Sequence, residues 1–221
     1  MERRLVGKSI TMNFLITAGG TREYIDPVRF ISNAGSGKMG YAVARAAIGA
    51  GHAVTLITAP TGLRLPKKAR VIKVQTSAEM FAAVKKNFAK CDCLIMTAAV
   101  CDYAPVKTAT NKIKKRAAAL TIELKLTADI LKWAGTHKKK KQLVVGFALE
   151  DKALRKNAQK KLSEKKLDMI IANSPAAIGA EKSTVHIKTS DGPWSVLPNT
   201  SKRTSAKKII AIVSSLAGLK R

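Results

Sequence analysis

The sequence predicts an α/β fold, in which a doubly wound, mostly parallel sheet carries helices on both faces. Short continuous apolar runs alternate with amphipathic stretches, and the 221-residue chain is 46% hydrophobic and 25% charged, which is an ordinary globular balance. Runs rich in Ile, Val and Leu are typical of strands that are buried on both faces. Their alternation with helices predicts right-handed crossovers and a Rossmann-like sheet.

The expected elements follow one another in a regular order. We expect strands at residues 13–17, 53–58, 93–98, 143–147 and 168–172. We expect helices, from apolar residues at helical spacing, at residues 38–49, 77–89, 129–135, 152–166 and 202–216.

Two further segments predict β structure outside this pattern. Residues 112–125 include a stretch with apolar residues at every second position, which predicts a flap of strands with one exposed face. Residues 185–196 contain an Asp-Gly pair between two β-prone runs, which predicts a hairpin. No linker divides the chain, so we expect a single domain over residues 1–221, with residues 1–12 as a frayed extension.

The charge of the chain points to anionic partners. Lys and Arg number 41 against 14 Asp and Glu, a formal net charge of +27, which favours phosphate-bearing substrates or nucleic acid. Aromatic residues make up only 5% of the chain, too few for an interleaved base-stacking surface. Nucleic acid is therefore not expected, despite the charge.

The cysteines indicate a reducing compartment. Cys91, Cys93 and Cys101 are an odd, closely spaced set, which excludes a disulfide framework, and we interpret them as buried thiols rather than as metal ligands. No apolar run approaches the ~20 residues of a membrane span. We therefore expect a cytoplasmic protein with no membrane association.

Three polar clusters follow directly on predicted strands, where open α/β sheets bind their ligands. The first, residues 17–23, contains Gly19 but lacks the third glycine of a dinucleotide fingerprint. The second, residues 26–40, enters a helix near Lys38, an arrangement that favours anion binding. Its residues do not match a Walker P-loop, because Met39 stands where a magnesium-binding hydroxyl belongs.

The third cluster, residues 97–105, leads by a short loop to four residues rich in lysine. Asp102 is suited to hydrogen-bond a sugar hydroxyl or an amino group. Lys112 and Lys114 would alternate on one strand face, where they would either reach a triphosphate or form a solvated sheet edge.

These motifs closely resemble a known family, bacterial phosphopantothenoylcysteine synthetase, the phosphopantothenate–cysteine ligase of coenzyme A biosynthesis. The resemblance covers residues 13 to 215 in order. It rests on residues 16–23, 25–33, 36–40, 98–103, 112–115, 146–150 and 167–173, and on the lysines at 161 and 165. Family members are commonly fused to a flavin-dependent decarboxylase, and the short segment before residue 13 leads us to expect a stand-alone ligase.

The resemblance implies a reaction in two steps. CTP first activates the carboxylate of 4′-phosphopantothenate, which gives an acyl-cytidylate and pyrophosphate, and the amine of L-cysteine then displaces CMP. Mg²⁺ would bridge the CTP phosphates, held mainly by substrate oxygens, so no protein metal site is expected. Because the anhydride supplies the leaving group, no nucleophilic side chain is required.

The resemblance also implies roles for individual residues. Asn33 would orient the acyl-cytidylate for attack by cysteine, and Lys112 would contact the nucleotide phosphates. The remaining nucleotide-binding positions are Gly19, Ala99, Asp102, Phe147, Lys161 and Lys165, and the phosphopantothenate-binding positions are Arg29, Asn33, Ser36, Gly37 and Lys38. The family forms homodimers in which the β segment reaches across, so residues 112–125 are also the expected interface.

One departure from the family pattern concerns the nucleotide. Residues 125–129 lack the Asn-Pro pair that usually precedes Asp-Ile-Leu, so ATP stays open beside CTP. Two other functions also remain open: a Rossmann-like nucleotide-binding reductase and a basic nucleic-acid-binding protein, the latter predicting steeply salt-dependent binding.

Overall fold

The computed structural model describes residues 11–115 and 119–220. Its centre is an eight-stranded sheet in the order β12-β11-β10-β9-β6-β1-β4-β5. These strands are β1 (Asn13–Ala18), β4 (Ala53–Thr58), β5 (Arg70–Lys73), β6 (Cys93–Met96), β9 (Leu143–Leu149), β10 (Met169–Asn173), β11 (Lys182–Thr189) and β12 (Trp194–Ser201). Six neighbouring strands are parallel, namely β5, β4, β1, β6, β9 and β10. Strand β11 is antiparallel to β10, and β12 is antiparallel to β11.

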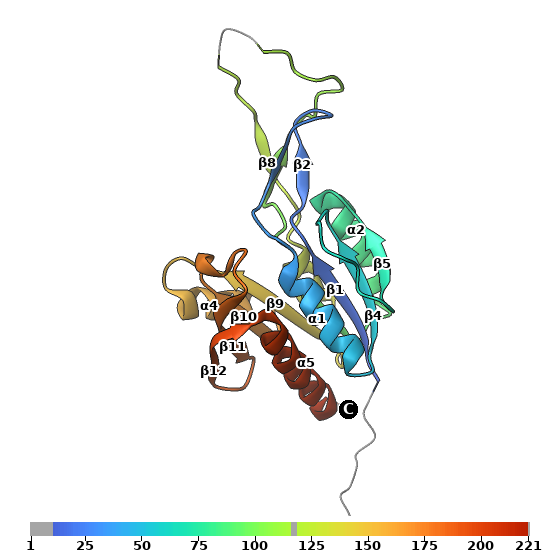
Figure 1. Ribbon diagram of the computed structural model, residues 1–221, viewed down its shortest axis with the longest axis vertical. Coiled ribbons are helices and arrows are strands. Elements are labelled where there is room, and N and C mark those ends of the chain that lie inside the picture. The colour runs from blue at the N-terminus through green and yellow to red at the C-terminus, as the bar shows by residue number, and fades with distance from the viewer. Residues whose placement is uncertain (1–10, 116–118, 221) are drawn as a thin grey trace, which may run out of the picture.

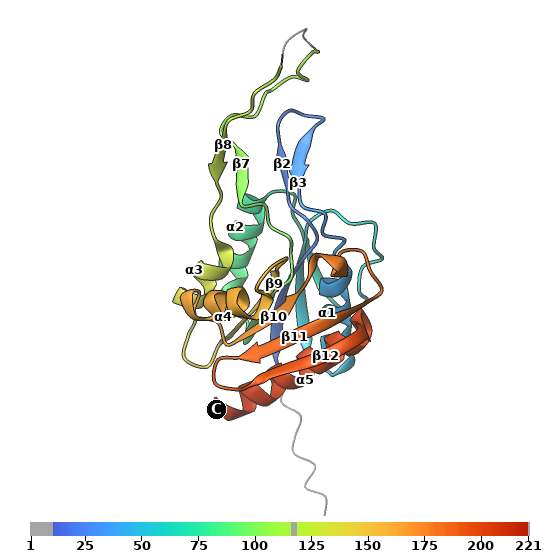
Figure 2. The ribbon, with the colours of Figure 1, turned by 90° about the vertical axis from the view of Figure 1, so that its left-hand side faces the viewer.

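Helices cover both faces of this sheet, as Figures 1 and 2 show. One face carries α1 (Lys38–Gly49) and α5 (Lys202–Leu219), and the other carries α2 (Ser77–Phe88), α3 (Ile130–His137) and α4 (Leu154–Glu164). In β1, Phe14 and Ile16 pack into the core beneath α1 and α5, whereas Leu15 packs into the opposite core. Burial on both faces explains the continuous apolar run, and the doubly wound fold is confirmed.

Two small antiparallel pairs project from the carboxyl ends of the central strands. The first is β2 (Arg22–Tyr24) with β3 (Phe30–Ser32), and the second is β7 (Tyr103–Pro105) with β8 (Leu124–Leu126). Beyond β7 and β8 lies a long excursion that we call the arm, defined as the described residues 106–115 and 119–123 (Figure 1).

The flap prediction over residues 112–125 is wrong for most of its described residues, and residues 116–118 lie outside them. Lys112–Lys115 and residues 119–123 are irregular, and only Leu124–Leu126 forms a strand, paired with β7. Leu120 lies in no strand, and Leu124 and Leu126 stay exposed although their strand is paired with β7. The hairpin prediction is confirmed, with β11 and β12 paired in antiparallel fashion.

The amino-terminal prediction falls mostly on residues 1–10, outside the described residues. Met12, which we assigned to the frayed extension, is instead buried, and its backbone N–H donates to Nδ1 of His52 at 3.3 Å. Among the described helices, none has the length and apolar character needed to cross a bilayer.

Candidate active site

The chain reverses its direction of travel across the sheet between β1 and β6. From β1 it moves outward to β4 and β5, then returns to β6 on the other side of β1. Loops that follow the two strands diverge at such a point and leave a crevice beyond the carboxyl ends. A cleft of about 930 Å³ lies there.

The cleft brings together most of the site residues predicted from the sequence. Nine of the twelve line it: Asn33, Ser36, Gly37, Lys38, Ala99, Asp102, Phe147, Lys161 and Lys165. Gly19, Arg29 and Lys112 are not among the lining residues. Residues far apart in the sequence therefore share one cavity, while Lys112 stands outside it on the arm.

The amino terminus of α1 opens into the cleft without a side-chain cap. Gly37 occupies the N-cap position with a φ of 74°, and no side chain hydrogen-bonds to the first turn from that position. A Cβ on Gly37 would lie 2.7 Å from Cγ2 of Thr61 and 3.4 Å from Cα of Gly19. Gly19 thus lies against the turn. The Lys38 N–H has one long contact of 3.5 Å to Ser36 Oγ, and the Lys38 ammonium pairs with Glu181, so an anion at this helix end would meet backbone N–H groups and would compete with Glu181 for Lys38.

Asn33 joins two walls of the cleft. Its Nδ2 donates to the carbonyl oxygen of Val100 at 3.0 Å, with a longer contact of 3.5 Å to that of Ala99. The residue follows β3, whereas Val100 and Ala99 follow β6. The neutral amide is therefore fixed at the edge where the two loops meet, and a carboxylate there would face carbonyl oxygens.

The side chains that line the cleft carry a net positive charge, which Glu150 and Glu181 offset by pairing with Lys161 and Lys38. Four lysines and two aspartates line the cleft: Lys38, Lys161, Lys165, Lys202, Asp102 and Asp129. Lys161 pairs with Glu150 at 2.6 Å, and Lys165 pairs with Asp129 at 2.8 Å. Partial burial raises the pKa of Asp129, but hydrogen bonds from Lys165 and the Lys132 backbone outweigh it, so the net shift is downward.

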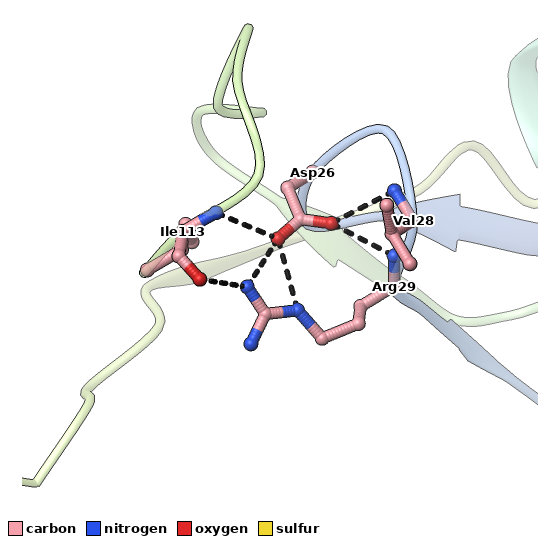
Figure 3. Close-up of polar contacts among 4 residues, drawn as sticks. All are labelled: Asp26, Val28, Arg29 and Ile113. Carbon is pink, nitrogen blue, oxygen red and sulfur yellow. Dashed lines mark hydrogen bonds and ion pairs between the residues drawn. The ribbon is translucent and has the colours of Figure 1, made fainter. Parts of the chain in front are cut away.

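Arg29 is turned toward the arm. Its guanidinium donates to the buried carboxylate of Asp26 and to the carbonyl oxygen of Ile113, as Figure 3 shows. Ile113 follows Lys112 directly in the chain, so Arg29 holds the arm at the residue next to Lys112. Both predicted residues therefore lie outside the group of nine that lines the cleft.

Comparisons with known proteins agree with this architecture. A family model described as the DNA/pantothenate metabolism flavoprotein C-terminal domain matches residues 10–216. The chain belongs to this family. The crystal structure of the C-terminal domain of the coenzyme A biosynthesis bifunctional protein CoaBC is 36% identical, with a TM-score of 0.81 over 95% of this chain and 98% of that one.

Curated relatives of the pantothenate metabolism family are longer than this chain. The CoaBC of Bacillus subtilis is 44% identical over 208 residues, which are 92% of this chain and 51% of the relative. A protein of an unknown prokaryote, named cysteine/cysteine sulfinic acid decarboxylase, is 46% identical over 180 residues, 81% of this chain and 49% of that protein. The chain thus spans about half the length of these relatives.

Lys202 also lines the cleft, although we did not predict it as a site residue from the sequence. Burial lowers its pKa, and the nearby Lys38 adds to that shift, while Glu181 opposes it. Because β11 and β12 reverse the chain twice, α5 begins on the same edge of the sheet as α1. The predicted hairpin followed by a helix starting after Ser201 was the signal that could have located this lysine.

The thiols and acidic groups do not form a metal cluster in the part of the chain that the structure describes. Cys93 and Cys101 are buried and Cys91 is partly buried. Burial raises the pKa of Cys91 to about 11 and also raises those of the other two, so all three favour the neutral thiol.

Proposed function

We propose that this chain is a phosphopantothenate–cysteine ligase of coenzyme A biosynthesis, acting as one domain in the cytoplasm. It would join 4′-phosphopantothenate to L-cysteine through an acyl-cytidylate, with release of pyrophosphate and CMP. The observation that carries the proposal is the family match over residues 10–216, together with a lysine-lined cleft at the switch point of the sheet.

The first step brings two anions together, so positive charge must precede chemistry. A triphosphate and a carboxylate repel each other until cations and N–H dipoles offset their charge. Lys161 and Lys165 line one part of the cleft, and the open end of α1 with Ser36 and Lys38 lines another. We assign the lysines on and after α4 to the nucleotide, and the α1 end to the phosphate of phosphopantothenate.

The second step needs an orienting group rather than a nucleophile from the protein. Asn33 has a fixed amide at the junction of two loops, where it would hold the acyl-cytidylate while the cysteine amine attacks. Ala99 and Asp102 on the neighbouring loop, with Phe147 after them, would frame the base and ribose. The amide bond forms as CMP leaves.

Mg²⁺ fits this set of residues as a substrate-borne ion. Magnesium commonly keeps several waters and takes substrate phosphate oxygens, so it needs no dedicated set of protein ligands here, and Asp102 stays assigned to the base and ribose. When bound, the ion would offset charge on the nucleotide phosphates. Lysines of the cleft would orient those phosphates.

CTP is the nucleotide that we propose, with ATP as the competitor. Leu126, Thr127, Ala128 and Asp129 line the cleft, so the segment that departs from the family pattern borders the proposed nucleotide site. The family's Asn-Pro pair is missing from this segment, and its absence would affect which base the site selects. Assays with CTP and ATP in parallel would measure that selection.

The arm supports a homodimer with shared sites. Lys112 and Arg29 do not line the cleft of their own chain. Exposed apolar side chains gather along the arm and the two small strand pairs: Val28, Phe30, Tyr103, Val106, Leu120, Leu124 and Leu126. Clustered exposed apolar groups mark interaction surfaces. We propose that a second copy covers them, with the arm delivering Lys112 to its cleft.

Mixing two strongly impaired variants tests this arrangement. In a heterodimer of Lys112→Gln with Asn33→Asp, a site shared between chains would combine a normal cleft with a normal arm, and ligase activity would return. If Lys112 serves its own chain, every site keeps one defect and the mixture stays impaired. Sedimentation of the wild type gives the oligomeric state independently, and a monomer would refute the shared site.

The activity itself is tested with purified protein, 4′-phosphopantothenate, cysteine, Mg²⁺ and each nucleotide in turn. We expect the amide product and CMP in equal amounts with CTP. A product that forms without nucleotide, or none with any nucleotide, would contradict the proposal. Tight nucleic-acid binding without pyrophosphate release would instead favour the basic nucleic-acid-binding alternative.

A further inference from the structure

The carboxylate of Asp26 is the meeting point of the arm and the β2–β3 hairpin. Its side chain is fully buried, and both oxygens are engaged (Figure 3). Oδ1 accepts the backbone N–H groups of Val28 and Arg29 at 2.9 and 2.8 Å. Oδ2 accepts the guanidinium of Arg29 and the backbone N–H of Ile113 at 3.1 Å.

The two oxygens therefore serve different purposes. Oδ1 closes the local turn between β2 and β3, within three residues of Asp26. Oδ2 reaches a residue 87 positions away and fixes the backbone of the arm. Arg29 donates to the carbonyl oxygen of Ile113 at 2.7 Å, so the N–H and the C=O of Ile113 are both hydrogen-bonded. We call this arrangement of Asp26, Arg29 and Ile113 the clamp.

Other contacts bind the arm to the hairpin before this point. Thr108 donates its hydroxyl to the Tyr24 carbonyl oxygen at 2.9 Å, and the Ala109 N–H donates to the Ile25 carbonyl oxygen at 2.9 Å. The clamp at Ile113 is the contact adjacent to Lys112. Without it, Lys112 would lie on an irregular stretch anchored three residues earlier.

We propose that Asp26 is a positioning residue, which holds Ile113 through its Oδ2 and through Arg29 so that Lys112 is presented in one fixed place. The proposal rests on the proposed function, in which Lys112 contacts the nucleotide phosphates. It also assigns Arg29 a place in the clamp beside its proposed contact with phosphopantothenate.

A carboxylate is required in this place because all of its neighbours are donors. Asparagine could keep the turn through its Oδ1, but its NH₂ group would then face the Ile113 N–H and the guanidinium. The hydrogen bonds from Arg29 and from the three backbone N–H groups outweigh the effect of burial and hold the pKa of Asp26 far below its usual range. The clamp is thus closed at every pH at which the enzyme would work.

Asp26→Asn should remove the contacts of Oδ2 with Ile113 and Arg29 and keep the turn contacts of Oδ1. Thr108→Val is the matched control. The control removes one arm-to-hairpin hydrogen bond without touching Ile113. Hydrogen exchange of the Ile113 amide should quicken by about tenfold or more in Asp26→Asn, because a hydrogen bond to a charged acceptor is worth more than one factor of ten. It should stay unchanged in Thr108→Val. Equal exchange in Asp26→Asn and wild type would overturn the clamp.

Kinetics then test whether the clamp acts through Lys112. Asp26→Asn should lower kcat for pyrophosphate release about tenfold and leave the KM for cysteine unchanged. In a Lys112→Gln background it should lower the residual rate no further, because its effect passes through the lysine that is already gone. A further equal loss in that background would overturn the positioning role and indicate general destabilisation.

The exchange measurement does not depend on ligase activity. A wild-type chain with no activity toward any nucleotide would refute the proposed function and the catalytic purpose of the clamp. Its Ile113 exchange would still decide whether Asp26 anchors the arm.

Discussion

Replacing Gly37 by alanine tests whether the open end of α1 is the phosphate site. Gly37 has a φ of 74°, a region in which an L-residue pays roughly 1–2 kcal/mol. The new Cβ would also lie 2.7 Å from Cγ2 of Thr61. Thr61 is held at this place, since its hydroxyl donates to Tyr41 and accepts from the Leu63 N–H. The turn itself must therefore shift.

Gly51→Ala is the matched control for this change. Gly51 has a φ of 86°, and a Cβ there would meet nothing within 4 Å. The control carries the backbone cost alone, at the far end of α1. Each 1 kcal/mol should lower the melting temperature by roughly 2–4 °C in a chain of this size. We expect a loss of that order for Gly51→Ala and a larger one for Gly37→Ala.

Binding should separate the two variants more clearly than stability does. A shifted turn misdirects N–H groups toward the anion, and a loss of about 1.4 kcal/mol corresponds to a tenfold weaker affinity. Calorimetric titration should therefore show Gly37→Ala binding 4′-phosphopantothenate about tenfold more weakly, with Gly51→Ala like wild type. Pantothenate, which lacks the phosphate, should not distinguish the variants. Equal affinity of Gly37→Ala and Gly51→Ala for the phosphorylated compound would refute the assignment.

Three further predictions concern groups in and around the site. Asn33→Asp should release pyrophosphate but little CMP, because a carboxylate facing the Val100 carbonyl oxygen misplaces the intermediate; undiminished CMP release would remove Asn33 from the second step. Cys91, whose pKa burial raises to about 11, should react slowly with iodoacetamide at a pH of about 8 in the native protein and quickly after unfolding, whereas rapid native labelling would contradict its burial. Burial lowers the pKa of His52 in the folded chain, so its contribution to stability is complete above about pH 6.5 and is lost as the pH falls through the folded pKa. Unfolding free energies of wild type and His52→Gln should therefore converge toward acidic pH, and a constant difference would contradict this linkage.

Elements with a strong internal pattern could be predicted closely from the sequence. The helix at residues 38–49 has the observed bounds of α1, and the strands at 13–17 and 53–58 match β1 and β4 within one residue. The helix is buried along one stripe and the strands are buried on both faces, so packing in the core determines where their apolar residues lie. Cleft residues of the β1–α1 connection and those after β6 came together because parallel strands place their following loops at one edge.

Segments stabilised by remote or absent partners could not be predicted. The β2–β3 hairpin has three-residue strands, and its turn depends on the buried Asp26 and on Ile113 from the arm. Strand β5 is an edge strand of four residues with charged ends, which gives a weak apolar signal. In the arm, alternating apolar residues suggested strands, but their pattern serves an exposed surface rather than a sheet within the chain.

The most direct test of whether a mixed anhydride forms in the cleft is to run the reaction without cysteine. With 4′-phosphopantothenate, CTP and Mg²⁺ alone, we predict one equivalent of pyrophosphate per site and an enzyme-bound acyl-cytidylate detectable by mass spectrometry. Cysteine added afterwards should discharge it to the amide and CMP. No pyrophosphate burst without cysteine, while the complete mixture still forms the amide, would contradict the mechanism.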